Sequence, residues 1–259
     1  MSQQHLTQII TNKQVEIEKL RENQDEIITN ASKLPVQKNR FVDAISSPKL
    51  HLIAEVKKAS PSKGIIRKDF NPVDIAIDFQ KNGASALSVL TETDFFLGHP
   101  DYISQIKERV SLPILRKDFI IDPIDIYRSK IMGADAILLI KAILSISSCE
   151  MMISIAHSLG LDVILEVHNH EEVDAIKSLT PDIIGINNRD LTNFNVDITY
   201  AAQLKPIIQQ FHKGLVIAES GYSTAEEATT LHQQGFNAVL IGEGLAKNPS
   251  LLSYWSHEN

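Results

Sequence analysis

From about residue 51 onward, the chain alternates short apolar runs with amphipathic stretches of helical length. Regular alternation of strands and helices predicts a parallel sheet with right-handed crossovers. Runs such as Ala136–Ile140 are continuously apolar, as is typical of strands that are covered on both faces. Eight such units in about 200 residues match a closed (β/α)8 barrel better than an open, doubly wound sheet. The predicted strands are His51–Val56, Ala86–Leu90, Pro113–Leu115, Ala134–Ile140, Asp162–Val167, Asp182–Ile186, Leu215–Ala218 and Ala238–Ile241.

The barrel leaves no room for a second domain, so we expect residues 1–259 to form a single barrel domain. Residues 1–46 are expected to form a helical extension that packs on the barrel. Helical spacing predicts one helix from about residue 4 to 23, then a polar link through Lys33–Val36 and a short helix near Phe41–Ser46. No Gly-x-Gly-x-x-Gly motif follows the first predicted strand, which weighs against a dinucleotide-binding fold.

The composition excludes several classes of function. The formal net charge is −7, so the chain has no basic footprint for nucleic acid. No apolar run approaches the roughly 20 residues that span a bilayer, and the amino terminus lacks the apolar core of a signal peptide. The single cysteine, Cys149, excludes an internal disulfide and fits a reducing compartment, where we expect it to pack in a helix. We therefore expect a cytoplasmic protein that binds neither membranes nor nucleic acid.

Polar and charged side chains follow the predicted strands at the point where each strand ends. Glu55 and Lys57 are two residues apart in an extended segment, so they project to the same face. Burying opposite charges side by side costs desolvation, which an active site explains better than stability does. In (β/α)8 barrels the active site is built at the carboxyl-terminal ends of the strands. The side chains expected to converge there are Glu55, Lys57, Lys117, Glu166, Asn187, Arg189, Glu219 and Ser220.

Two glycine-containing loops, residues 219–224 and 241–245, follow the last two predicted strands. Glycine lets backbone amides approach an anion, and the corresponding loops of this fold often bind phosphate. A single glycine at a strand-to-helix turn usually serves only the geometry of the turn. The occurrence of both loops together favours a phosphate site.

The charged residues suggest acid–base chemistry. A lysine beside a glutamate stays an ammonium group, which can donate a proton to a carbonyl or hydroxyl oxygen. Glu166 interrupts an apolar strand and is either a base or acid, or an ion-pair partner of the lysines. Arg189 can bind a carboxylate through two parallel hydrogen bonds. Lys141 also follows a strand, but we favour a structural role for it. His168 and His170 are a weak metal signal, so we assign no metal and no cofactor.

Five segments carry a further signal: Ile53–Gly64 with Asp69–Pro72, Leu115–Phe119 with Ile121–Pro123, Leu165–Asn169, Gly185–Leu191 and Ala218–Gly221. Together they resemble the indole-3-glycerol-phosphate synthase family of tryptophan biosynthesis, over nearly the whole chain. The resemblance implies a ribulose-phosphate-binding type of barrel and a decarboxylating lyase. Its implied substrate is the small phosphosugar 1-(2-carboxyphenylamino)-1-deoxyribulose 5-phosphate, which is converted to indole-3-glycerol phosphate, CO2 and water.

The resemblance also implies roles for individual residues. Lys117 is implied as the acid for ring closure, with Glu166 as the later base and Glu55 keeping the lysines charged and oriented. The residues do not decide which lysine acts in which step. The implied catalytic set is Glu55, Lys57, Lys117, Glu166 and Asn187. The implied substrate-binding set is Ser60, Phe96, Phe119, Arg189 and Glu219, and the implied phosphate-binding set is Lys57, Ser220, Gly221, Gly242 and Glu243.

Two positions depart from the family pattern, and three rival functions stay open. His99 stands where the family usually has a small residue, and Gly244 stands where alanine or a bulkier residue is expected. The rivals are a Schiff-base aldolase that uses Lys117 or Lys141, a non-catalytic phosphosugar-binding barrel, and phosphoribosylanthranilate isomerase. We expect a monomer, although the sequence does not determine the oligomeric state.

Overall fold

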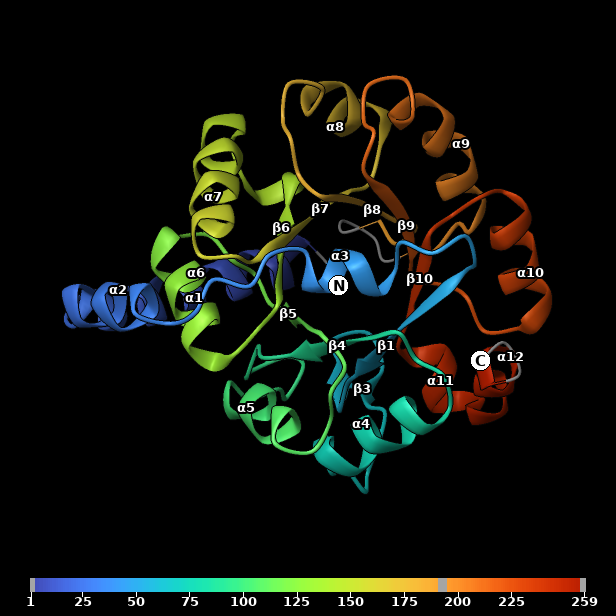
Figure 1. Cartoon of the computed structure of the whole chain (residues 1–259), viewed down its shortest axis with the longest axis horizontal. Helices are drawn as coiled ribbons and strands as arrows, with labels where there is room; N and C mark the ends of the chain where they lie inside the picture. Colours follow the sequence, from blue (N-terminus) through green and yellow to red (C-terminus); the bar gives the residue numbers. More distant parts are fainter. Residues whose placement is uncertain (1–2, 191–194, 257–259) are drawn as a thin grey trace.

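In the computed structural model, which describes residues 3–190 and 195–256, eight parallel strands close into a barrel (Figure 1). The barrel strands are β1 His51–Val56, β4 Ala86–Leu90, β5 Ile114–Lys117, β6 Ala136–Ile140, β7 Asp162–Val167, β8 Ile183–Asn187, β9 Leu215–Glu219 and β10 Ala238–Ile241. Each strand pairs with its neighbour in sequence, and β10 pairs with β1 to close the ring. The predicted (β/α)8 barrel is confirmed, and every predicted strand overlaps an observed one.

Helices follow the strands and form the outer layer of the barrel (Figure 1). They are α4 Pro72–Lys81, α5 Asp101–Lys107, α6 Pro123–Met132, α7 Ile146–Ser158, α8 His170–Ala175, α9 Thr199–Ile208, α10 Ala225–Gln233, α11 Glu243–Lys247 and α12 Ser253–Ser256, with 3-10 turns η1 Lys141–Ile143 and η2 Pro249–Leu252. Among the described residues, none of these helices is both long and apolar enough to cross a bilayer.

Side-chain caps fix the points at which several outer helices begin. Asn71 accepts a hydrogen bond from the backbone of Val73 at 3.0 Å, and Asp122 accepts one from Ile124 at 2.9 Å. In both cases a proline occupies the first helical position, where its missing N–H costs nothing. These caps end each strand-to-helix loop at a defined residue, which limits the freedom of the loops at the mouth of the barrel.

The two-residue period of the strands divides the apolar side chains into two cores. Inward-facing residues such as Ile53, Leu115 and Ile164 fill the barrel, whereas their outward-facing neighbours pack beneath the helices. Cys149 of α7 is buried in the outer core as a free thiol, as expected from the sequence.

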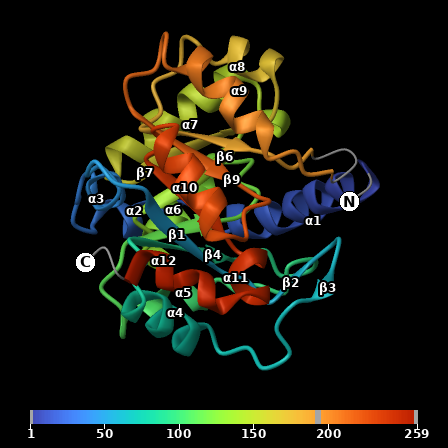
Figure 2. The same ribbon diagram turned by 90° about the vertical axis from the view of Figure 1, so that its right-hand side faces the viewer.

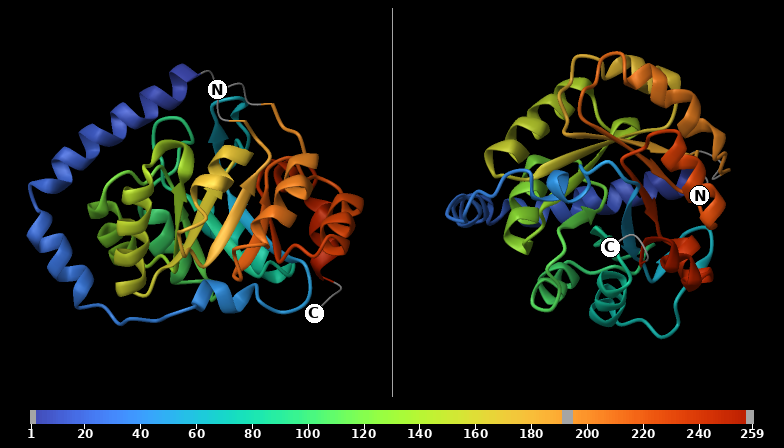
Figure 3. Two further views of the ribbon diagram at one scale, coloured as in Figure 1. Left: turned by 90° about the horizontal axis from the view of Figure 1, so that it is seen from above. Right: turned by 45° about the vertical axis from the view of Figure 1, so that its right-hand side comes forward.

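The segment before the barrel contains three helices: α1 Gln3–Arg21, α2 Gln24–Ser32 and α3 Arg40–Ala44. Figure 3 shows α1 running along one end of the barrel and α3 lying across the other end. The polar link through Lys33–Val36 lies outside the helices as predicted, but the prediction lacked α2, which precedes the link and packs on α6. The observed link begins only after Ser32.

The loop after β1 contains a small hairpin of its own. Strand β2 Ala59–Ser60 pairs antiparallel with β3 Gly64–Ile65, separate from the barrel sheet. Figure 2 shows this hairpin projecting beside the end of the barrel at which α1 lies. The backbone of Ala59 donates a hydrogen bond to Phe96 at 3.2 Å, which ties the hairpin to the loop after β4.

Candidate active site

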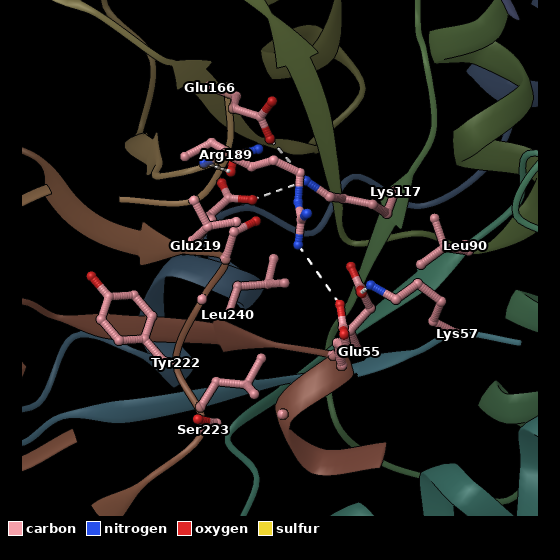
Figure 4. Close-up of a pocket in the computed structure, with 18 of the residues that line it drawn as sticks. Glu55, Lys57, Leu90, Lys117, Glu166, Arg189, Glu219, Tyr222, Ser223 and Leu240 are labelled. Atoms are coloured by element: carbon pink, nitrogen blue, oxygen red, sulfur yellow. Dashed lines mark hydrogen bonds and ion pairs between the residues drawn. The ribbon is translucent and has the colours of Figure 1, made fainter. Parts of the chain in front are cut away.

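A cavity of about 770 Å³ opens at the carboxyl-terminal ends of the barrel strands (Figure 4). This volume lies within the range that is usual for small-molecule sites. Of the residues proposed from the sequence, the cavity brings together Glu55, Lys57, Phe96, Lys117, Phe119, Glu166, Asn187, Arg189, Glu219, Ser220, Gly221, Gly242 and Glu243.

The period of the strands explains why these polar groups face the cavity. Glu166 lies two residues after Ile164, and Lys117 lies two residues after Leu115, so each points inward above an apolar residue of the inner core. The apolar layer closes the bottom of the site. Charges at the next inward position are therefore buried at the base of an open cavity, where water contributes little screening.

The Lys117 ammonium group is the centre of the site. Its Nζ lies 2.9 Å from Glu166 Oε2 and 2.9 Å from Glu219 Oε2, so it joins β5 to β7 and β9 across the barrel mouth (Figure 4). Burial by itself lowers the pKa of Lys117, but the charges of Glu166, Glu219 and Glu55 outweigh burial and raise that pKa well above its usual value. Lys117 is therefore a cation at all physiological pH values.

The two carboxyl groups on Lys117 titrate in opposite directions. Burial favours the neutral form of Glu166, but Lys117 and His168 outweigh it and hold the pKa of Glu166 well below its usual range. Burial and the charge of Glu166 raise the pKa of Glu219 to about 7, against the attraction of Lys117. Like charges that share one site separate in this way. The site thus holds one carboxyl group that stays ionised, Glu166, and one that carries a proton near neutral pH, Glu219.

Glycine at position 185 makes room for Glu219. Gly185 lies at the inward-facing position of β8, and a Cβ atom there would collide with Glu219 Oε1. The missing side chain lets the Glu219 carboxyl group occupy the space between β8 and β9.

The raised pKa of Glu219 predicts a pH-dependent cost in stability. In the unfolded chain a glutamate titrates near about 4.3, whereas Glu219 in the folded chain titrates at about 7. As pH rises between these values the unfolded state loses a proton that the folded state keeps, so the free energy of unfolding falls. We expect Glu219→Gln to raise the free energy of unfolding by about 1–3 kcal/mol at pH 8 and to leave it nearly unchanged at pH 4.

Urea unfolding at both pH values measures this difference. The exposed Glu150→Gln provides the matched control, because it removes the same charge from the surface of α7. Equal stabilisation of Glu219→Gln at pH 4 and pH 8 would contradict the raised pKa.

A second ion pair joins Glu55 and Lys57 at the end of β1. The Glu55 side chain is 5% exposed and the Lys57 side chain is 17% exposed, so the pair lies at the wall of the cavity. A Cβ atom at Gly242 would collide with Glu55 Oε1 and lie 2.9 Å from Lys57 Nζ. The glycine at the end of β10 therefore lets this pair sit against the backbone of the loop. The two lysines are paired separately, Lys57 with Glu55 and Lys117 with Glu166 and Glu219.

The end of β8 presents an amide and a guanidinium group to the cavity. Asn187 Oδ1 accepts a hydrogen bond from the backbone N–H of Arg189 at 3.0 Å, which fixes the first turn of the loop. Arg189 Nη2 lies 3.8 Å from Glu243 Oε2, and Lys247 Nζ lies 2.6 Å from Glu243 Oε1. The Glu243 carboxylate is thus held by cations. The Glu243 side chain is negatively charged, so only the backbone N–H of this residue can donate a hydrogen bond to an anion.

Aromatic and aliphatic side chains form the apolar wall of the cavity. The rings of Phe96 and Phe119 lie 6.1 Å apart at an interplanar angle of 43°. Leu90, Leu138 and Ile140 line the cavity below them. This wall suits a flat aromatic ligand.

The loop after β9 has an unusual backbone. Ser220 and Gly221 both have positive φ angles, 66° and 95°, and a non-glycine residue in that region is uncommon. Asn188 holds the loop in place by donating hydrogen bonds to the Ser220 carbonyl at 3.0 Å and to the Tyr222 hydroxyl at 2.9 Å. Burial raises the pKa of Tyr222 to about 12, so it remains a neutral phenol.

Gly244 is required by the approach of two loops. A Cβ atom at position 244 would collide with the backbone carbonyl of Tyr222 and lie 3.2 Å from Ser223 Cα. This backbone, in which the loops after β9 and β10 lie in contact, therefore has no room for a side chain at position 244; the expected difference from the family pattern stays a prediction. His99 has a side chain that is 51% exposed and contacts Asp101, outside the cavity.

Ser60 is the proposed site residue that does not line the cavity. It is paired with Gly64 in the β2–β3 hairpin and is 9% exposed. Among the described residues its hydroxyl has no hydrogen-bond partner. The sequence analysis did not predict this hairpin. The proposed contact of Ser60 with substrate stays a prediction.

Lys63 and His168 are functional candidates that the sequence analysis missed. Lys63 lies in the turn of the β2–β3 hairpin and lines the cavity. Its position in the glycine- and proline-rich loop after the first strand could have indicated it. His168 shares the inward phase of Glu166, a signal that was read only as a weak metal motif. In the part of the chain that the structure describes, no group of three or more His, Cys, Asp or Glu side chains could hold a metal ion.

A buried charge network lies behind Lys117. Arg116 is fully buried and lies 2.8 Å from Asp118 and 3.2 Å from Asp125. Lys13 of α1 lies 3.0 Å from the same Asp118 oxygen. Burial opposes ionisation, but Arg116 and Lys13 outweigh it and hold the pKa of Asp118 well below its usual range. The network fixes the loop that follows β5 and ties it to α1.

Sequence comparison identifies close relatives of the chain. The family model described as indole-3-glycerol phosphate synthase matches residues 6–254. The indole-3-glycerol phosphate synthase of Alkaliphilus metalliredigens (strain QYMF) is 45% identical over 226 residues, which cover 87% of this chain and 86% of the relative. The indole-3-glycerol phosphate synthase of Chlorobium phaeovibrioides (strain DSM 265 / 1930) is 48% identical over 205 residues, which cover 79% and 78%.

Solved structures resemble the chain at much lower identity. Tryptophan synthase subunit alpha from Legionella pneumophila str. Paris has a TM-score of 0.61 at 14% identity, over 84% of this chain and 97% of that one. A mutant tryptophan synthase alpha-subunit from Pyrococcus furiosus has a TM-score of 0.58 at 15% identity, over 82% and 93%. At such low identity this likeness concerns the barrel fold alone.

Proposed function

This chain belongs to the indole-3-glycerol phosphate synthase family, and we propose that it is a carboxy-lyase of tryptophan biosynthesis that acts through the Lys117 cluster. It converts 1-(2-carboxyphenylamino)-1-deoxyribulose 5-phosphate to indole-3-glycerol phosphate, with loss of CO2 and water. The observation that carries the mechanism is the position of the Lys117 ammonium group, 2.9 Å from each of two carboxyl groups at the base of the cavity.

The phosphate group is bound by the loops after β9 and β10. Ser223 and Thr224 donate their backbone N–H groups to Glu227 at 2.6 and 3.0 Å, so the phosphate is left to the earlier part of the first loop, Ser220 and Gly221. The loop after β10 contributes the backbone N–H groups of Gly242 and Glu243 to the phosphate. Lys57 adjoins Gly242 and supplies the positive charge.

The aromatic end of the substrate lies against the apolar wall of the cavity. Phe96 and Phe119 hold the ring, and Arg189 binds the carboxylate through parallel hydrogen bonds. Glu243 lies near Arg189 before substrate binds, so the substrate carboxylate takes the place of a protein carboxylate. Asn187 positions Arg189 by accepting the hydrogen bond from its backbone.

Ring closure begins when the ring carbon that bears the carboxylate attacks the ketone carbon. Negative charge develops on the ketone oxygen, and Lys117 donates a proton to it. An alkoxide oxygen is a far stronger base than the carboxylates that surround Lys117, so the transfer is favourable in spite of the raised pKa of the ammonium group. The bond to the carboxylate then breaks, CO2 leaves, and its electron pair restores the aromatic ring.

Dehydration completes the indole. The hydroxyl group formed by the first step leaves as water, for which an acid must protonate its oxygen. Glu166 takes the proton from the neighbouring carbon of the new five-membered ring. Lys57 and Glu219 are the groups beside the cavity that can supply the acid, and Glu219 carries a proton near neutral pH because its pKa is raised to about 7.

The geometry disfavours two of the three rival functions. A Schiff-base aldolase needs a neutral lysine as nucleophile, whereas the carboxylates around Lys117 raise its pKa. Lys141 does not line the cavity, and its Nζ donates to the Leu144 carbonyl at 2.9 Å. A protein that only bound phosphosugars would have no use for a buried cluster of one ammonium and two carboxyl groups. We further propose that the protein is a cytoplasmic monomer that uses no cofactor.

The first test is turnover of the carboxyphenylamino-deoxyribulose phosphate by the purified chain. We expect indole fluorescence to rise and CO2 to be released in equal amounts. A folded protein that released neither would contradict the proposed function. Covalent trapping of substrate by borohydride would instead support the aldolase.

Arg189→Ala should weaken substrate binding more than it slows the chemistry. Hydrogen bonds to charged groups are worth about 1.5–3 kcal/mol, so we expect KM to rise by about 10-fold or more while kcat changes less. Steady-state kinetics measure both constants. Arg109→Ala, at an exposed arginine that precedes β5 at the other end of the barrel, is the control. A loss confined to kcat would argue against carboxylate binding by Arg189.

A further inference from the structure

His168 lies directly behind Glu166. It follows β7 and shares the inward phase of Ile164 and Glu166, two residues apart in each case. Its Nε2 atom lies 3.0 Å from Glu166 Oε1, and its side chain is 6% exposed. His168 is absent from the lining of the cavity, so it contacts Glu166 without contacting the space where substrate binds.

The two oxygens of Glu166 have different partners. Oε2 accepts from Lys117 at 2.9 Å, and Oε1 faces His168 at 3.0 Å. We propose that His168 is a positioning residue that holds Oε1 of Glu166, so that Oε2 is directed at Lys117 and the reacting atoms. By its positive charge, His168 also keeps Glu166 ionised in a buried site. This proposal rests on the proposed role of Glu166 as the base.

Glu172 in the first turn of α8 holds the imidazole ring from the other side. Glu172 Oε2 lies 3.1 Å from His168 Nδ1 and accepts from the backbone N–H of His168 at 2.9 Å. Glu172 is itself fixed, because Asn169 Nδ2 donates to its Oε1 at 3.2 Å and Asn169 Oδ1 caps its backbone at 2.8 Å. Glu172 thus gives Nδ1 an acceptor and limits rotation of the ring, whereas Nε2 meets Glu166 Oε1 as a close ion pair without hydrogen-bond geometry.

An imidazole with a carboxylate at each nitrogen is stabilised in its protonated form. Burial lowers the pKa of His168, but Glu166 and Glu172 outweigh it and raise that pKa to about 10. Glu166 also faces Lys117 from β5 and shares that lysine with Glu219 from β9. Glu166 thus lies between two cations, and loss of His168 leaves it with one.

His168→Gln tests the proposal, with His170→Gln as the matched control. His170 lies two residues further on at an exposed position and is not in contact with Glu166. We expect His168→Gln to lower kcat by about 10-fold or more with little change in KM. The acid limb of the kcat–pH profile should move up by about one unit or more, since Glu166 loses a cation and becomes easier to protonate.

Glu172→Gln is the second variant, because its amide oxygen can still accept from the backbone of His168. Removal of the Glu172 charge weakens the positive charge on His168, so the acid limb should move in the same direction by less. Thermal unfolding confirms that each variant is folded.

A folded His168→Gln with normal kcat and a normal acid limb would overturn the proposal. A fall in kcat with an unmoved limb would overturn it as well, because a purely structural role predicts that result. Glu166→Gln, measured in parallel, distinguishes failure of the proposed base role of Glu166 from failure of the proposed positioning role of His168. A normal kcat of Glu166→Gln would contradict the role of Glu166 as the base. A strongly lowered kcat of Glu166→Gln together with a normal kcat of His168→Gln would contradict only the role of His168.

Discussion

Lys117→Ala should lower kcat for indole formation by about 10²-fold or more, the range typical of a positioned general acid. The substitution removes the proton donor for the ketone oxygen and leaves Glu166 and Glu219 without the cation that both contact. One of these buried carboxyl groups must then take up a proton. The loss should therefore appear in kcat rather than in KM, because the phosphate loops and Arg189 are untouched.

Two further variants separate the proton from the charge. Lys117→Arg keeps a cation in the cluster, but the planar, larger guanidinium group cannot take the position of the compact ammonium group between the two carboxyl groups, so we expect it to restore stability without restoring turnover. Lys141→Ala is the control, and we expect it to leave kcat nearly unchanged. It removes a lysine that follows the next strand, β6, and whose Nζ donates a hydrogen bond to the Leu144 carbonyl outside the cavity. Near-normal kcat in a folded Lys117→Ala protein would remove the acid assignment.

The strands and the place of the site could be predicted because both depend on local pattern. Continuous apolar runs such as Ala136–Ile140 can only be buried strands or helices, and their short, regular spacing selects the barrel. Once the sheet is parallel and closed, the residues at the strand ends must meet at one mouth. Lys117 and Glu166, 49 residues apart in sequence, could therefore be expected to lie together.

Loops and long-range packing limited the prediction elsewhere. Helix α2 is polar except for a narrow stripe, and its partner α6 lies about 100 residues further on, so its pattern alone did not distinguish it from a link. The hairpin in which Ser60 pairs with Gly64 was not predicted, because strands of two residues are too short to show a periodic pattern. The contacts of His168 were missed because its two partners lie at different spacings. Glu166 lies two residues earlier, as in a strand, and Glu172 lies four residues later, as in a helix.

The opposite pKa shifts of the two carboxyl groups on Lys117 favour different roles, Glu166 as a proton acceptor and Glu219 as a proton donor. A group that must accept a proton has to be ionised beforehand, and Glu166 meets that condition because Lys117 and His168 lower its pKa. Glu219 carries a proton near neutral pH, since burial and Glu166 raise its pKa to about 7. The environments push two like groups apart, which is the usual basis of acid and base assignments in an active site.

Glu166→Gln should also lower the rate of indole formation by about 10²-fold or more. The amide cannot take the proton from the five-membered ring, so the loss should fall on dehydration, after CO2 has left. In a single turnover we expect Glu166→Gln to release CO2 faster than indole fluorescence appears, whereas the wild type should show no such lag. Glu171→Gln, on the exposed face of α8, is the control.

The order of the two signals determines the role of Glu166. Equal slowing of CO2 release and fluorescence would place Glu166 before decarboxylation, in support of Lys117 at ring closure. Near-normal rates for both would exclude it as a catalytic group. A lag between CO2 and indole requires a decarboxylated, still hydroxylated intermediate on the enzyme. Such an intermediate can accumulate only if the missing group acts after the carboxylate is lost, which is the step proposed for Glu166.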